Sequence, residues 1–224
     1  MNAKATSTTT PQTNSVSQIQ TELAAALSSA DAAATQAAQN LQLLYQARLS
    51  GLSRTAASLK AQLPPADPRV VAASAAVAAT MVAAGRAGIV SQQLGTPVPQ
   101  IPQGGWAVHG RVFTDQFQPM AALTVFLVDA RKAYQQKYGF AYTDDTGYFL
   151  INYAGAPAGG APPPLSIEIT NQSGKPVYLD AASFLPVPNA ATYRNIVLPP
   201  NPQPIGAPPP AARSSAGPAS RKKQ

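Results

Sequence analysis

The chain has 224 residues, no cysteine, a single histidine and only 11% charged residues. Without cysteine, a disulfide framework and a thiolate metal site are excluded, and the lone His109 removes most schemes that need several imidazoles. At this length the chain has room for a buried core and for one or two domains.

The net charge of +7 is unevenly distributed along the chain. Residues 105–199 hold six Lys or Arg against six Asp or Glu, whereas residues 200–224 hold four Lys or Arg and no acid. A nucleic-acid-binding surface needs basic residues interleaved with aromatic residues on one folded face. Because the excess lies at the ends of the chain, we expect no specific nucleic-acid partner.

Residues 1–15 are rich in Thr, Ser and Asn, and we expect them to form a disordered leader. No apolar run follows Lys4, so we expect no Sec signal peptide in this segment. The compartment stays open. The sequence fits a cytoplasmic protein, and it also fits one exported as part of a larger particle or by a signal-independent route.

Residues 16–63 contain no proline and are rich in alanine, which predicts a helix. Their apolar positions step by four and three residues, the heptad spacing of a coiled coil, and then resume out of step at Tyr45. This phase change has two explanations. It is either a stutter that locally unwinds a coiled coil, or a break at Ser50 and Gly51, since glycine costs about 1 kcal/mol inside a helix.

A second helix is predicted over residues 68–94. Asp67 suits the N-cap, Pro68 the first turn, and Gly95 the end of the helix. Its most apolar window, residues 70–85, is built on alanine and is shorter than the ~20 residues that cross a bilayer, so we expect no transmembrane span. The short connection should fold this helix back antiparallel, which makes residues 16–94 a helical hairpin and the predicted assembly region.

The second helix is shorter than the first and should reach back only to about residue 36 at ~1.5 Å per residue. The apolar positions before that point then lack an intrachain partner. We expect this seam to pair with the same segment of other copies or with a scaffold helix. The predicted seam residues are Leu23, Leu27, Ala30, Ala34 and Leu41.

After a Pro/Gly linker at residues 95–105, the hydrophobic period changes to two, which predicts a β region over residues 106–199. Short alternating runs separated by turn residues favour an antiparallel β-sandwich. The runs are residues 106–115, 123–130, 138–144, 147–154, 165–171, 176–181 and 193–198. Residues 200–224 should form a disordered, basic Pro/Ala-rich tail. The expected class is therefore an α+β multidomain protein.

The stretch FAYTDDTGYFLINY at residues 140–153 places two aspartates between alternating runs. Aspartate side chains accept hydrogen bonds from backbone N–H groups two residues on, and glycine tolerates a positive φ. We therefore interpret Asp144, Asp145 and Gly147 as the structural corner of a β-hairpin and not as a catalytic carboxylate pair.

Three elements of this region resemble the carboxypeptidase regulatory-like domain, a small transthyretin-like β-sandwich with an Ig-like fold. The likeness covers residues 105–199. It is carried by Val108, Gly110, Val112, Val125, Leu127, Thr143, Asp144, Gly147, Tyr148 and Phe149. The resemblance implies that the TD-x-x-G segment is a hairpin corner. Some transthyretin-like proteins are hydrolases of a purine-breakdown intermediate, but they rely on several histidines and an arginine-bearing C-terminal motif that this chain lacks.

The sequence contains neither G-x-S-x-G nor G-x-x-x-x-G-K-[ST], so we expect no enzyme, no catalytic residue, no cofactor and no metal ligand. The prediction is a structural or interaction protein that assembles through its helices and displays a β-sandwich. The main alternative is a carbohydrate- or cell-surface-binding module with a sugar-stacking surface. Its candidate residues are Tyr134, Tyr138, Tyr142, Tyr148 and Tyr153. A hydrolase using His109 ranks third.

Overall fold

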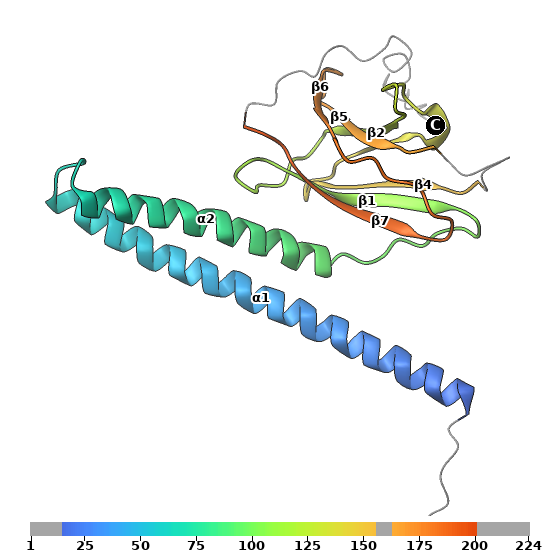
Figure 1. Ribbon diagram of the computed structural model, residues 1–224, viewed down its shortest axis with the longest axis horizontal. Coiled ribbons are helices and arrows are strands. Elements are labelled where there is room, and N and C mark those ends of the chain that lie inside the picture. The colour runs from blue at the N-terminus through green and yellow to red at the C-terminus, as the bar shows by residue number, and fades with distance from the viewer. Residues whose placement is uncertain (1–14, 156–162, 201–224) are drawn as a thin grey trace, which may run out of the picture.

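The computed structural model describes residues 15–155 and 163–200, which form two long helices followed by two β-sheets (Figure 1). This confirms the predicted α+β arrangement. The predicted disordered leader, except Ser15, and the predicted disordered tail, except Pro200, lie outside the described residues.

Helix α1 runs without interruption from Val16 to Gln62. Ser15 caps its first turn, because the Ser15 hydroxyl accepts from the Gln18 N–H while the Gln18 side chain accepts from the Ser15 N–H at 2.9 Å. The hypothesis of a helix break at Gly51 is therefore wrong. Forty-seven consecutive helical residues offset the local cost of one glycine, because helix propagation is cooperative.

Helix α2 spans Pro68–Leu94 and packs antiparallel against α1 (Figure 1). The Asp67 carboxylate accepts from the Arg69 N–H at 2.9 Å, and Gly95 ends the helix. Among the helices of the described residues, α2 is the one long and apolar enough to cross a membrane by length and composition. Since this is a property that core helices share, the expected absence of a transmembrane span stays a prediction.

The side chains that α1 buries against α2 follow an unbroken heptad with no stutter. The buried and half-buried side chains of this face are Thr35, Ala38, Gln42, Tyr45, Leu49, Leu52, Ala56, Leu59 and, just beyond the helix, Leu63. The predicted seam from Leu23 to Leu41 lies on a neighbouring face of α1, about 100° around the helix, because it is one residue out of phase with this heptad.

A three-stranded sheet has the order β4-β1-β7, in which β1 (Trp106–Phe113) pairs antiparallel with β4 (Tyr148–Tyr153) and parallel with β7 (Ala191–Val197). The expectation of purely antiparallel pairing is therefore wrong. The reason is that β7 enters the sheet at the same end as β1, where the Asn189 N–H donates to the Gly105 carbonyl at 2.6 Å.

The second sheet is four-stranded and antiparallel, in the order β3-β2-β5-β6. Its strands are β2 (Thr124–Val128), β3 (Phe140–Tyr142), β5 (Ser166–Thr170) and β6 (Pro176–Leu179). A single 3₁₀ turn, η1 (Gln136–Tyr138), precedes β3, so the predicted run 138–144 is mostly outside the strand.

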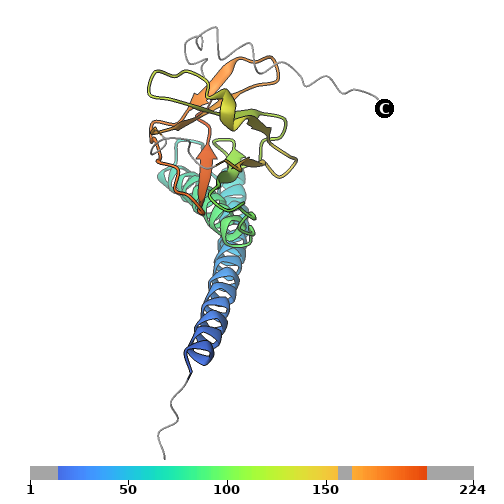
Figure 2. The ribbon, with the colours of Figure 1, turned by 90° about the vertical axis from the view of Figure 1, so that its right-hand side faces the viewer.

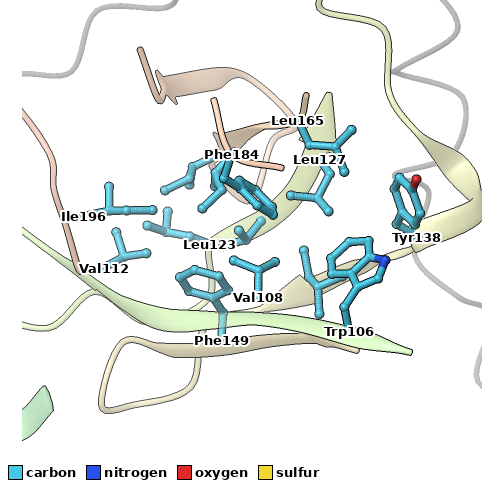
Figure 3. Packing of buried hydrophobic residues seen from close by; sticks show 14 of the residues in the cluster. Trp106, Val108, Val112, Leu123, Leu127, Tyr138, Phe149, Leu165, Phe184 and Ile196 are labelled. Carbon is cyan, nitrogen blue, oxygen red and sulfur yellow. The ribbon is translucent and has the colours of Figure 1, made fainter. Parts of the chain in front are cut away.

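One apolar core lies between the two sheets, and inward-facing side chains of both contribute to it (Figure 3). Val108, Phe149 and Ile196 come from the three-stranded sheet, and Leu127 and Ile167 from the four-stranded one. Burial of each such side chain stabilises the fold by roughly 1.5–3 kcal/mol. The β region therefore has a core of its own, separate from the helical hairpin.

The β region contacts the helical hairpin near the C-terminal end of α2. The Asn195 side chain donates to the Gln93 side chain of α2 at 2.9 Å, and the Asn152 side chain donates to the carbonyl of Gln100 in the following linker at 3.2 Å. The N-terminal half of α1 projects away from both α2 and the β region (Figure 2).

Candidate interaction surface of the helical hairpin

The N-terminal part of α1 extends beyond the reach of α2. Pro68 follows Gln62 across the connection, and the Gln42 side chain lies 3.5 Å from the position of a Cβ at Gly88. Because the two helices run antiparallel, each further residue along α2 lies beside the preceding residue of α1, so Leu94 lies level with Gln36. Every residue from 16 to 34 is exposed. We call residues 16–34 the free segment.

The free segment carries an apolar stripe along one face. Leu23 and Leu27 are 58% and 57% exposed, and Val16 and Ile19 are exposed as well. These positions and the two alanines that follow them step by three and four residues, so they share one side of the helix. The apolar stripe consists of Val16, Ile19, Leu23, Leu27, Ala30 and Ala34. Within the described residues nothing covers it.

The same face of α1 leads into an apolar groove beside α2. The groove has a volume of about 410 Å³. It is lined by Ala38, Leu41, Tyr45, Ala79, Val82, Ala83, Arg86, Ala87 and Val90. Of the predicted seam residues, only Leu41 meets α2 here, whereas Leu23, Leu27, Ala30 and Ala34 do not. The predicted seam residues all lie on α1, so they did not include the α2 wall of this hairpin groove.

Charge separates the free segment from the rest of the hairpin. Residues 16–47 contain Glu22 and Asp31 and no Lys or Arg. Residues 48–94 contain five Lys or Arg against Asp67 alone. One of these cations, Arg86, lines the groove. The surface therefore joins an acidic, apolar helix to a basic, apolar groove.

The Asp144–Gly147 turn is held by one aspartate of the pair. The Asp144 carboxylate accepts from the Thr146 N–H at 2.8 Å and from the Tyr148 N–H at 2.9 Å, whereas Asp145 is exposed. Burial raises the pKa of Asp144, but the hydrogen bonds from Thr146 and Tyr148 outweigh it, so this pKa lies below its usual value. Such a carboxylate is a hydrogen-bond acceptor in the turn.

This turn does not join two paired strands, as the predicted hairpin required. Strand β3 belongs to the four-stranded sheet and β4 to the three-stranded one, so the turn carries the chain across the core. Gly147 has φ of +72°, and the carbonyl of Val112 occupies the space that a side chain there would need. The close approach of the Val112 carbonyl explains why residue 147 is a glycine.

His109 lies on the outer face of the three-stranded sheet and is only 3% exposed. Its ring makes edge-on contacts with Tyr193 at 5.0 Å and Tyr148 at 6.0 Å, and its Nδ1 lies 3.3 Å from the Tyr148 hydroxyl. Burial lowers the pKa of His109. Both of these partners are tyrosines, so the contacts do not supply the further histidines and the arginine on which the predicted hydrolase chemistry relies.

The candidate sugar-stacking tyrosines do not lie on one surface. Tyr138 and Tyr153 pack against Trp106 at the end of the core, with ring centroids 5.0 and 5.7 Å from it. Tyr134 packs against Phe126 at 5.3 Å. Tyr148 faces His109 as described above, and Tyr142 is 54% exposed.

Tyr142 instead borders a pocket of about 450 Å³ at one end of the neighbouring strands β3, β2 and β5 of the four-stranded sheet. The other residues that line it are Ala122, Thr124, Thr143, Thr170, Asn171, Gln172 and Gly174. Among the residues that the structure describes, no three His, Asp or Glu side chains come together as a metal site would require.

No family model matches the chain, and no curated protein sequence matches it. Several solved structures share a partial likeness. The dioxygenase domain of a dioxygenase carbohydrate-binding protein fusion from Streptomyces sp. SirexAA-E is 14% identical with a TM-score of 0.27, covering 46% of this chain and 84% of that one. GBS52, the minor pilin of Streptococcus agalactiae, is 15% identical with a TM-score of 0.29, covering 49% and 50%.

Chlorocatechol 1,2-dioxygenase from Pseudomonas putida is 10% identical with a TM-score of 0.30, covering 72% of this chain and 99% of that one. Likenesses at these TM-scores carry no argument about function.

Proposed function

We propose that this chain is a structural or interaction protein that self-associates through its helical hairpin and displays its β region. The observation that carries the proposal is the free segment, whose apolar stripe meets water along its whole length. A continuous exposed apolar face on a helix is typical of a protein–protein interface. Burial of this stripe against another helix would stabilise the assembly.

The β region is, in this proposal, a displayed β-sandwich of the carboxypeptidase regulatory-like, Ig-like type. Its support is the core shared by the two sheets and the position of Gly110, which is buried in β1 between Phe149 of β4 and Arg194 of β7. A side chain at Gly110 would collide with the Arg194 carbonyl of the neighbouring strand, so the V-x-G-x-V pattern marks a close approach of two strands. A β-sandwich with its own core suits display, because it holds its shape without the helices.

The test compares two exposed leucines of α1 in the full chain. Leu27 lies on the apolar stripe and is 57% exposed, whereas Leu43 is 62% exposed and points to the opposite side of the helix. We expect Leu27→Glu to shift the chain toward monomer in analytical ultracentrifugation at micromolar concentration, and Leu43→Glu to leave its mass unchanged. A wild-type chain that is monomeric under these conditions would overturn self-association.

The second candidate function is a carbohydrate-binding module displayed by the same assembly. The observation in its favour is the pocket beside Tyr142, where an exposed aromatic ring adjoins threonine hydroxyls and an asparagine amide. Binding to a glycan array that Tyr142→Ala abolishes, with the melting temperature unchanged, would support it. Neither candidate assigns a reaction to the chain. A hydrolytic activity lost in His109→Ala without unfolding would contradict both.

A further inference from the structure

We propose that the hairpin groove is filled by the free segment of a second copy of this chain, lying antiparallel to α1, and that the exchange is mutual. The inference rests on the proposed self-association and gives it a partner, a direction and a register. Each end of the resulting dimer would contain α1, α2 and the free segment of the other copy packed side by side.

The apolar stripe is complementary to the α1 wall of the hairpin groove when it is reversed about Ala34. In that register Leu27 faces Leu41 of the second copy, and Leu23 faces Tyr45 of the second copy. The large side chains thus meet on either side of a centre made of alanines, Ala30 and Ala34, which lets the two helices approach closely. Such a two-fold arrangement uses the same patch on both chains and closes at the dimer.

The dimensions of the two surfaces agree. The free segment would extend for roughly 28 Å as a helix, and the α2 wall of the groove, from Ala79 to Val90, for roughly 18 Å. Since Leu23 faces Tyr45 and Tyr45 lies level with Gly85, the wall from Ala79 to Val90 lies level with residues 17 to 28 of the incoming segment, so Ile19, Leu23 and Leu27 would fill the groove. Ala30 and Ala34 would pack beyond one end of this wall, against α1 of the second copy.

Charge favours the antiparallel direction. Tyr45 lies level with Gly85 of its own α2, since facing residues of α1 and α2 run in opposite order. Glu22 would therefore lie nearly level with Arg86 of the second copy, which lines the groove, but it projects about 100° around the helix from Leu23, so the attraction acts between the acidic free segment and the groove and not as a direct ion pair. A parallel, in-register pair would instead set Glu22 against Glu22 and Asp31 against Asp31, and like charges repel.

The β region leaves this groove open. The face of α2 that approaches the β region contains Met81, Gly85 and Ile89, which line a separate cleft together with Phe117. The groove wall contains Val82, Arg86 and Val90 on another side of the helix. An incoming helix would therefore contact α1 and α2 without displacing the β-sheets.

Charge reversal in the full chain tests the placement of the acidic free segment beside the groove. We expect Glu22→Arg and Arg86→Glu each to raise the dimer dissociation constant about threefold, and the double variant to recover part of the wild-type affinity, because each change reverses one side of this attraction. Arg54→Glu is the matched control, because Arg54 lies outside the groove lining and on the opposite side of α1 from the stripe. Equal weakening by Arg54→Glu, or no recovery in the double variant, would overturn the placement of the acidic segment beside Arg86.

Disulfide trapping separates the direction of pairing from self-association itself, and the native chain contributes no cysteine. Leu27→Cys chains mixed with Leu41→Cys chains should form a mixed disulfide dimer on mild oxidation, whereas Leu27→Cys chains alone should form little. A dimer that Leu27→Cys alone traps in high yield would overturn the antiparallel arrangement and leave the proposed function intact. A chain that ultracentrifugation shows to be monomeric would overturn both.

Discussion

The ring of Phe117 rests directly on Gly85, so that a Cβ at residue 85 would lie 2.5 Å from the ring Cγ and 2.9 Å from its Cβ. Phe117 belongs to the connection between β1 and β2, and Gly85 to the middle of α2. This contact joins the β region to the helical hairpin, because only a residue without a side chain lets the ring approach the helix so closely.

Gly85→Ala should therefore loosen this junction by about 1–3 kcal/mol, since overpacking forces Phe117 away. Hydrogen exchange of residues 113–119 in the full chain would measure the effect. Gly88→Ala is the matched control on the same helix, because its nearest neighbour lies 3.5 Å away, at an ordinary contact distance. We expect it to be neutral or to stabilise α2 by up to about 1 kcal/mol. Equal exchange in the two variants would contradict the junction.

Gly147→Val should destabilise the β region far more than Asp145→Ala. Valine cannot easily adopt φ of +72°, and its side chain would collide with the Val112 carbonyl. We expect a loss above about 3 kcal/mol for Gly147→Val and within about 0.5 kcal/mol for Asp145→Ala. Asp144→Ala should fall between them, at about 1–2 kcal/mol, because it removes the acceptor of the turn. Thermal unfolding monitored by circular dichroism would rank the variants, and similar melting temperatures for all of them would argue against the turn.

The stability of the folded chain should decrease as the pH falls below about 6.5 through His109. Burial lowers the pKa of His109 from its ordinary value of 6.5, so the unfolded chain binds the proton more readily than the folded one. This contribution to the free energy of unfolding is full above that pH and is lost toward the lower, folded-state pKa. Urea unfolding from pH 5 to 8 would measure it. His109→Phe should flatten this part of the profile, and an unchanged slope in that variant would assign it to other groups.

Residues 105–199 should fold alone as a monomer. Their two sheets share one core, to which the helices contribute no side chain. A fragment with dispersed amide resonances in NMR and monomeric mass would meet the expectation. An unfolded or aggregated fragment would mean that the contacts with α2 and with residues 95–104 are required for the β region to form.

Several elements followed from the sequence because short-range interactions decide them. Asp67, Pro68 and Gly95 mark the ends of α2 through capping and backbone geometry, which depend on a few neighbouring residues. The period of two in the β region predicted its strands for the same reason, since alternate burial is a local pattern. The exposed stripe was also predictable, because the lengths of the two helices show where α2 must end.

The tertiary structure decided which surfaces meet. The side of α1 that α2 covers begins at Thr35 and runs one residue out of phase with the leucine seam. Alanine-rich faces bury similar apolar areas, so their composition alone does not determine which of them packs against α2. The path of the connection between the two helices determines it. Likewise, the direction of β7 and the sheet-crossing role of Asp144 depend on where distant segments return to the core. Sequence patterns record the period of burial, whereas the partner is selected by packing between residues far apart in the chain.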